Sequence, residues 1–236
     1  MNLILLYSED FVNGPDRVRL EGRRFQHVLT VHRAAVGDEL SVGLLNGRIG
    51  TGKVTRLAQS VLEMEVRVQQ APPAPLPLTL ILAMPRPKVL RRTLRAVSSL
   101  GIKKIVLINS SRVEKSYWQT PFLNDAAVND QLVLGLEQAK DTILPEVLLR
   151  PLFKPFVEDE APGIIKETLP LVAHPAACEP VPRGANRAVT LAVGPEGGFI
   201  PYEIDKLVSC GFKPVSMGER ILSVETAVPA LIARLF

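Results

Sequence analysis

This chain of 236 residues has only two cysteines and no long hydrophobic run. Cys178 and Cys210 show no metal-ligand spacing, so we expect no metal site and two buried free thiols in a reducing compartment. The apolar run Met1–Tyr7 is far too short for a signal peptide or a membrane span, and no lysine or arginine precedes it. We therefore expect a first strand here, in a cytoplasmic protein without membrane contact.

The composition is that of a globular protein with a sizeable core, because 47% of the residues are hydrophobic and 22% are charged. The length suits one large domain, or a small domain followed by a medium one. The formal net charge of +4 is compatible with an anionic partner but does not require one.

The most informative stretch is Val189–Phe199, an apolar run that stops at the loop Gly-Pro-Glu-Gly-Gly. The run predicts a buried strand, and the glycines allow a ligand to approach the backbone because they carry no Cβ. The spacing differs from the G-x-G-x-x-G of dinucleotide-binding folds, and no Lys-Ser/Thr follows to make a P-loop.

A helix is expected to start at Pro201, so strand, loop and helix start have the arrangement that binds ligands at the carboxyl ends of strands in open α/β sheets. A second segment of the same design, Met217–Ala227, follows a short strand at Pro214–Met217. The two loops together predict a two-sided pocket. For the first loop alone, an ordinary Gly-Pro turn is an equally good interpretation.

Two domains are predicted, joined by a linker. Residues 1–70 contain short apolar runs separated by turns, which predicts a small β-barrel with one short helix at Arg24–Arg33. Residues 71–77 form an extended proline-rich linker. Residues 78–236 alternate strands and helices, which predicts an α/β domain with a parallel sheet. Its expected helices are Lys88–Leu100, Asn124–Asp141, Glu158–Thr168, one from Pro201, and a last one from Val224 with an apolar stripe that must be covered.

Basic side chains gather in two places. Residues 17–33 contain one acid, Glu21, beside Arg17, Arg19, Arg23, Arg24, His27, His32 and Arg33. Arg86, Lys88 and Arg112 lie near predicted carboxyl strand ends, where the pocket is expected. Each group is either a solvated surface or a set of phosphate contacts to RNA, and we retain both interpretations.

With these stretches in hand, the chain resembles the RsmE family, the 16S ribosomal RNA uridine-N3 methyltransferases of the SPOUT superfamily. Residues 194–199 match the family's G-P-E-G-G loop, and residues 218–227 match its G-x-R-[IV]-L-R-x-E-T-A segment. Further matches extend from end to end of the chain: Leu171–Pro175, Glu137-Gln138 with Pro145–Val147, Ser110 with Arg112, and His27 with Val31–Arg33.

The resemblance implies a PUA-like N-terminal barrel for RNA and a C-terminal SPOUT domain with a deep trefoil knot. It also implies a homodimer that acts on 16S rRNA of the small ribosomal subunit. S-adenosylmethionine would be held mainly by backbone groups of three loops, at Ala173, His174, Pro175, Gly194, Pro195, Glu196, Gly197, Gly198, Ser216, Met217, Gly218, Ile221 and Leu222.

Five positions depart from the family pattern: Thr30, His32, Ser99, Asp141 and Ser223. None of the five belongs to the implied cofactor residues. These departures therefore bear on which RNA is the target and not on the cofactor.

Methylation of uracil N3 requires an unpaired base and loss of the N3 proton, after which negative charge spreads onto the O2 and O4 carbonyls. Arg220 is the candidate for stabilising this charge, and Glu225 for orienting Arg220 or accepting the proton. The alternative for Arg220 is a loop-closing pair with Glu219 or Glu225. For the whole chain, the alternatives are a methyltransferase of another RNA, such as a tRNA ribose or base, and a non-catalytic RNA-binding protein.

Overall fold

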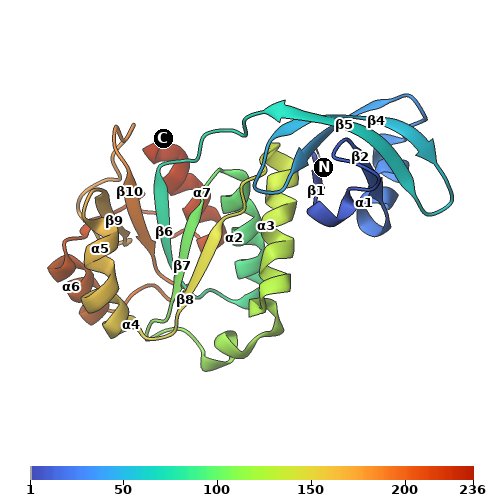
Figure 1. Ribbon diagram of the computed structural model, residues 1–236. Helices are drawn as coiled ribbons and strands as arrows, with labels where there is room; N and C mark the ends of the chain where they lie inside the picture. Colours follow the sequence, from blue (N-terminus) through green and yellow to red (C-terminus); the bar gives the residue numbers. More distant parts are fainter. Residues whose placement is uncertain (1) are drawn as a thin grey trace. The chain divides into compact units, whose positions relative to one another are not determined.

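The computed structural model describes residues 2–236, so Met1 of the predicted first run lies outside the described residues (Figure 1). The chain forms two compact units, Met1–Ala74 with Val133–Leu144, and Pro75–Leu132 with Pro145–Phe236. The sequence places residues 133–144 in the second domain, whereas their contacts group them with the first unit. The domain boundaries otherwise stay predictions.

The first unit contains a mixed five-stranded sheet in the order β1-β3-β4-β5-β2. The pairs are antiparallel except for β1 with β3. One face of the sheet packs into the core because apolar side chains alternate along it, as at Leu62, Met64 and Val66. The strands are β1 (Ile4–Leu6), β2 (Arg17–Leu20), β3 (Glu39–Leu44), β4 (Ile49–Leu57) and β5 (Leu62–Gln70).

The short helix predicted in this unit is present as α1 (Gly22–His27), which continues in wider π-helical turns over Val28–His32. Phe25 and Val28 are its buried residues. Arg33 ends it in the left-handed region, with φ of 53°.

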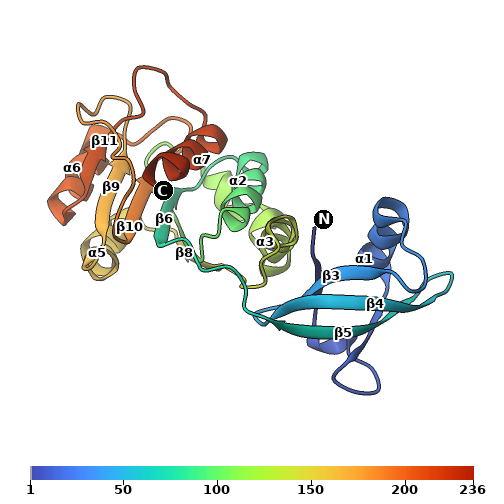
Figure 2. The ribbon, with the colours of Figure 1, turned by 90° about the horizontal axis from the view of Figure 1, so that it is seen from above.

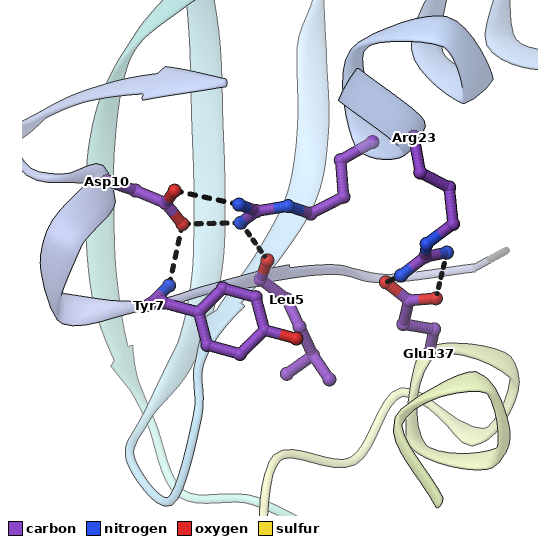
Figure 3. A network of polar contacts seen from close by, with 6 residues as sticks. Leu5, Tyr7, Asp10, Arg23 and Glu137 are labelled. Carbon is purple, nitrogen blue, oxygen red and sulfur yellow. Dashed lines mark hydrogen bonds and ion pairs between the residues drawn. The ribbon is translucent and has the colours of Figure 1, made fainter. Parts of the chain in front are cut away.

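Two arginines of this helix are bound by acids from elsewhere in the first unit (Figure 3). Arg24 contacts both carboxylate oxygens of Asp10 and the Leu5 carbonyl, and its guanidinium lies 4.7 Å from the centre of the Tyr7 ring. Arg23 makes two hydrogen bonds to Glu137, at 2.9 and 3.0 Å, and Glu137 belongs to α3 (Asp125–Ala139). The side chains of Asp10 and Glu137 are only 7% and 1% exposed.

The second unit contains a parallel six-stranded sheet in the order β11-β9-β10-β6-β7-β8, which confirms the predicted sheet type. Helices α2 (Pro87–Ser99) and α7 (Val224–Leu235) lie on one face, and α5 (Ala161–Ile165) and α6 (Pro201–Cys210) lie on the other (Figure 2). The strands are β6 (Leu78–Ala83), β7 (Lys104–Ile108), β8 (Glu146–Arg150), β9 (Leu169–Ala173), β10 (Val189–Val193) and β11 (Lys213–Val215).

The predicted helix Glu158–Thr168 is present with shifted bounds. Helical turns run without a break from Phe153 to Ile165, as α4 (Phe153–Pro155), wider π-helical turns at Phe156–Glu160, and α5. The apolar stripe of α7 is covered within the chain, and α7 contacts α2. Both cysteines are free as expected, but Cys178 is exposed and Cys210 only partly buried.

None of the helices in residues 2–236 is long and apolar enough to cross a membrane.

Replacing Asp10 by Ala should cost about 3–5 kcal/mol in the free energy of unfolding, because the Arg24 guanidinium, 16% exposed, would lose its paired charge. Urea-induced unfolding followed by circular dichroism measures the change. The matched control is Glu21→Ala, which breaks the exposed Arg19–Glu21 pair and should cost less than about 1 kcal/mol. Equal costs for the two variants would contradict a stabilising role of the Asp10–Arg24 pair.

Candidate functional site

A cavity of about 330 Å³ lies at the carboxyl ends of β9, β10 and β11. The register of the parallel sheet creates it, because Ala173 pairs with both Val193 and Val215, so the three strands end at the same level. All residues predicted for the cofactor line this one cavity: Ala173, His174, Pro175, Gly194, Pro195, Glu196, Gly197, Gly198, Ser216, Met217, Gly218, Ile221 and Leu222. Arg112 and Arg220 line it as well.

The glycine loop after β10 turns too tightly for side chains at two of its positions. A Cβ on Gly194 would lie 2.9 Å from the backbone nitrogen of Phe199, which cannot move without changing the loop. Gly198 has φ of +70° and donates its N–H to the Pro195 carbonyl at 2.8 Å. The backbone of this loop therefore stays uncovered on the cavity side.

Two carboxylates connect the loop to neighbouring helix starts. Glu196 accepts a hydrogen bond from the backbone N–H of Arg86, at 2.9 Å, immediately before α2. It thus takes the part that a glutamate of the helix's own first turn has in a capping box. Glu203, only 3% exposed, accepts from the N–H groups of Ile200 and Ser111, at 2.9 and 2.6 Å. These bonds fix α2, α6 and the segment after β7 to the cavity.

The two arginines of the cavity differ in their surroundings. Arg112 donates a hydrogen bond to the Gly197 carbonyl, and its side chain fills the space next to Gly197. Arg220 is exposed and, among residues 2–236, has no hydrogen bond or ion pair. Arg112 therefore holds the loop, while the guanidinium of Arg220 is available to a ligand.

Glu225, the second predicted catalytic residue, does not line the cavity. Its carboxylate pairs with Arg92 of α2, with 3.3 Å between the Arg92 Nη1 and the Glu225 Oε2. The loop-closing pair of Arg220 with Glu225, considered from the sequence, is therefore absent from the described part of the chain.

His174 has a structural part in the cavity wall. Its N–H donates to the Val215 carbonyl at 2.9 Å, and its Nδ1 accepts from the N–H of Ala176 at 3.3 Å.

The remaining lining residues are ones that sequence reasoning missed: Ala176, Val193, Phe199, Val215, Val224, Ala227 and Leu231. They are mostly the last residues of predicted strands and one face of the last helix. The ends of the predicted strands and the apolar face of the last helix were the sequence features from which these lining residues could have been predicted.

The basic residues predicted to contact RNA do not share one environment. Arg23 and Arg24 are bound to Glu137 and Asp10, and Arg19 pairs with Glu21 at 2.9 Å, whereas Arg17, Arg33, Arg86 and Lys88 are exposed. Among residues 2–236, the buried Nε2 of His27 has no hydrogen-bond partner. Burial lowers the pKa of His27, an effect that the nearby His32 reinforces.

A parallel α/β domain with a cavity at the carboxyl ends of its strands defines a ligand-binding α/β domain. No group of His, Cys, Asp or Glu within residues 2–236 is arranged to hold a metal ion. The comparison with known proteins identifies the family: the chain belongs to the RNA methyltransferase domain family, which matches residues 72–236.

Named relatives specify the resemblance further. The ribosomal RNA small subunit methyltransferase E of Treponema pallidum is 29% identical, over 99% of this chain and 90% of the relative. The protein of the same name from Synechocystis is 27% identical, over 92% of this chain and 72% of the relative. These relatives confirm the resemblance to the RsmE family that the motifs predict.

Solved structures show the same fold. The ribosomal RNA small subunit methyltransferase E of Neisseria gonorrhoeae, solved bound to S-adenosyl methionine, has a TM-score of 0.76 at 24% identity and covers 98% of this chain and 95% of its own. A Legionella pneumophila chain, also solved with bound S-adenosyl methionine, has a TM-score of 0.73 at 24% identity and covers 98% and 96%.

Replacing Gly194 by Ala should destabilise the second unit by about 1–3 kcal/mol, because the added methyl would press on the Phe199 backbone. Gly163→Ala is the matched control, since a Cβ there meets nothing within 4 Å and should stabilise slightly, by about 0.4–1 kcal/mol. Urea-induced unfolding compares the two variants with the parent. A Gly194→Ala variant as stable as the parent would show that the loop adopts another conformation in solution.

Proposed function

We propose that this chain transfers a methyl group from S-adenosylmethionine to N3 of a uridine in 16S rRNA of the small ribosomal subunit. The observation that carries the proposal is that every residue predicted to hold the cofactor lies around one cavity, at the edge of the sheet. Membership in the RNA methyltransferase domain family and the names of the relatives support the same conclusion.

The residues of the cavity fit this cofactor. The volume of about 330 Å³ is within the range of about 300–1,000 Å³ usual for small-molecule and cofactor sites. Val215, Leu222 and Leu231 offer apolar surface for an adenine ring, and the loop after β10 offers backbone groups to its polar edge. When bound, S-adenosylmethionine supplies an electrophilic methyl group.

Arg220 is the residue that we assign to the chemistry. Loss of the N3 proton leaves negative charge on the carbonyl oxygens of the uracil ring, and a positioned guanidinium stabilises such charge. Among the cavity residues, Arg220 is the basic side chain that the described residues do not bind internally.

Glu225 acts on this chemistry indirectly, through the start of α7. Its carboxylate lies near the positive end of the helix dipole and pairs with Arg92. We propose that the pair positions the segment from Arg220 to Ser223.

The finer features implied by the family resemblance are part of the proposal. They are the trefoil knot around the cavity, closure of the first sheet into a PUA-like barrel, a homodimer, RNA contacts by the exposed Arg17, Arg33, Arg86 and Lys88, and cytoplasmic location. Because the apolar stripe of α7 is covered within the chain, the homodimer rests on the family resemblance.

Ribosomal RNA from a strain that lacks the gene should lack one N3-methyluridine of 16S rRNA. A methyl group at N3 blocks the pairing edge of the base, so its loss removes a stop in reverse transcription. Purified protein with labelled S-adenosylmethionine should restore the methyl group on small-subunit particles. A methyl group missing from tRNA instead, or from no RNA, would refute the proposed substrate.

Arg220→Lys should lower the single-turnover rate of methylation at saturating cofactor by about 10²–10³-fold. Lysine keeps the charge but loses the planar guanidinium that aligns a carbonyl oxygen. Cofactor affinity measured by calorimetry should change little. The matched control is Arg187→Lys, at an exposed arginine outside the cavity, which should react like the parent. A near-parental rate for Arg220→Lys would remove Arg220 from the chemical step.

A further inference from the structure

Tyr117, Trp118 and Phe122 form an aromatic platform, as we call these three residues, between β7 and α3. They belong to two short 3-10 turns, Lys115–Gln119 and Pro121–Leu123, in which no residue is buried. Trp118 is the only tryptophan of the chain. Large aromatic rings that contribute little to a core and stay partly exposed are typical of surfaces that another molecule covers.

Specific contacts hold the three rings in place. The Trp118 Nε1 donates to the Asn109 side chain at 3.0 Å, at the carboxyl end of β7. The Tyr117 hydroxyl donates to Glu114 at 3.0 Å, and Arg91 of α2 lies 4.7 Å from the centre of the Phe122 ring. A surface that is positioned before a ligand arrives loses little conformational entropy on binding.

The aromatic platform is connected to the cavity through the segment that follows β7. The Trp118 Nε1 donates to Asn109, the first residue after β7. Three residues further on, Arg112 lines the cavity and donates a hydrogen bond to the Gly197 carbonyl. A molecule that covers the Trp118 ring is therefore close to the cavity.

Charge identifies the kind of partner. Arg91 lies over the Phe122 ring, and the exposed Lys115 opens the turn that holds Tyr117 and Trp118. Basic side chains beside partly exposed aromatic rings are the combination with which proteins bind single-stranded nucleic acid, because the cations meet phosphates and the rings stack on bases. An apolar protein partner would not require these cations.

We propose that the aromatic platform stacks an unpaired nucleotide adjacent to the uridine that enters the cavity. The inference rests on the proposed function and deepens it, since it assigns a binding site to the nucleotide that flanks the target. A base methylated at its pairing edge must leave the helix or lie in a single strand, and its neighbour then loses a stacking partner. Trp118 and Tyr117 replace that partner.

The single tryptophan allows a direct test. The full chain is titrated with a short single-stranded oligouridylate, without cofactor, and the emission of Trp118 is followed. Stacking should quench the emission in a saturable way, while a duplex of the same length should quench it weakly. Trp118→Ala and Tyr117→Ala should each raise the dissociation constant by about 5- to 150-fold, measured with labelled RNA. The dependence of affinity on salt should stay as in the parent, because no phosphate contact is removed.

Two further variants serve as controls. Trp118→Phe keeps a ring, so its dissociation constant for RNA should stay within a few-fold of the parent value. Tyr202→Ala removes an exposed aromatic ring next to Lys206 on α6, outside the aromatic platform, and should bind RNA like the parent. Emission that is unchanged at saturating RNA, or parental affinity in both Trp118→Ala and Tyr117→Ala, would overturn the inference. If Trp118→Ala does not fold, Tyr117→Ala decides. These measurements involve no methyl transfer. Failure of the rRNA methylation assay would therefore refute the proposed substrate but would leave the measured RNA binding to the aromatic platform unchanged.

Discussion

The common level at which β9, β10 and β11 end is the constraint on which the rest of the second unit depends. It brings three loops together, and backbone hydrogen bonds such as that from the His174 N–H to the Val215 carbonyl join them. Glu196 and Glu203 add to these bonds by accepting hydrogen bonds from N–H groups at the starts of α2 and α6. Because these helices also cover the two faces of the sheet, the cavity and the fold cannot change independently.

The basic residues near the N-terminus show how far charge along a sequence differs from charge in space. Residues 17–33 contain one acid, yet the acids that bind Arg23 and Arg24 come from α3 and from the turn after β1. A buried carboxylate without its arginine would be strongly unfavourable, so these two pairs are held by the fold whatever the partner. In the proposed function, phosphate contacts are therefore assigned to arginines at exposed positions, such as Arg17 and Arg33.

Sequence reasoning was most successful where a local rule decides the structure. Apolar runs predicted the parallel strands, and the Gly-Pro-Glu-Gly-Gly loop predicted the cavity, because missing side chains leave the backbone uncovered. It was unsuccessful where a contact with a residue far away in the chain determines the environment of a side chain. The pairing of Glu225 with Arg92, the cover of α7 by α2 and the bonds of Glu203 all join residues far apart in the chain. The earlier start and the wider turns of the helix at 153–165 are local features that the prediction missed, although the prolines of this segment are visible in the sequence.

Arg112 and Arg220 show why residue type alone does not assign a role. Both are arginines on loops of the same cavity, but a carbonyl group of the loop binds Arg112, whereas the contacts around Arg220 leave its guanidinium to a ligand. The acid of the cavity, Glu196, is likewise engaged at the start of α2. An engaged carboxylate does not become a second partner for Arg220, so positive charge persists at the mouth of the cavity. In the proposed function, this positive charge attracts the RNA phosphate backbone and then stabilises the deprotonated uracil.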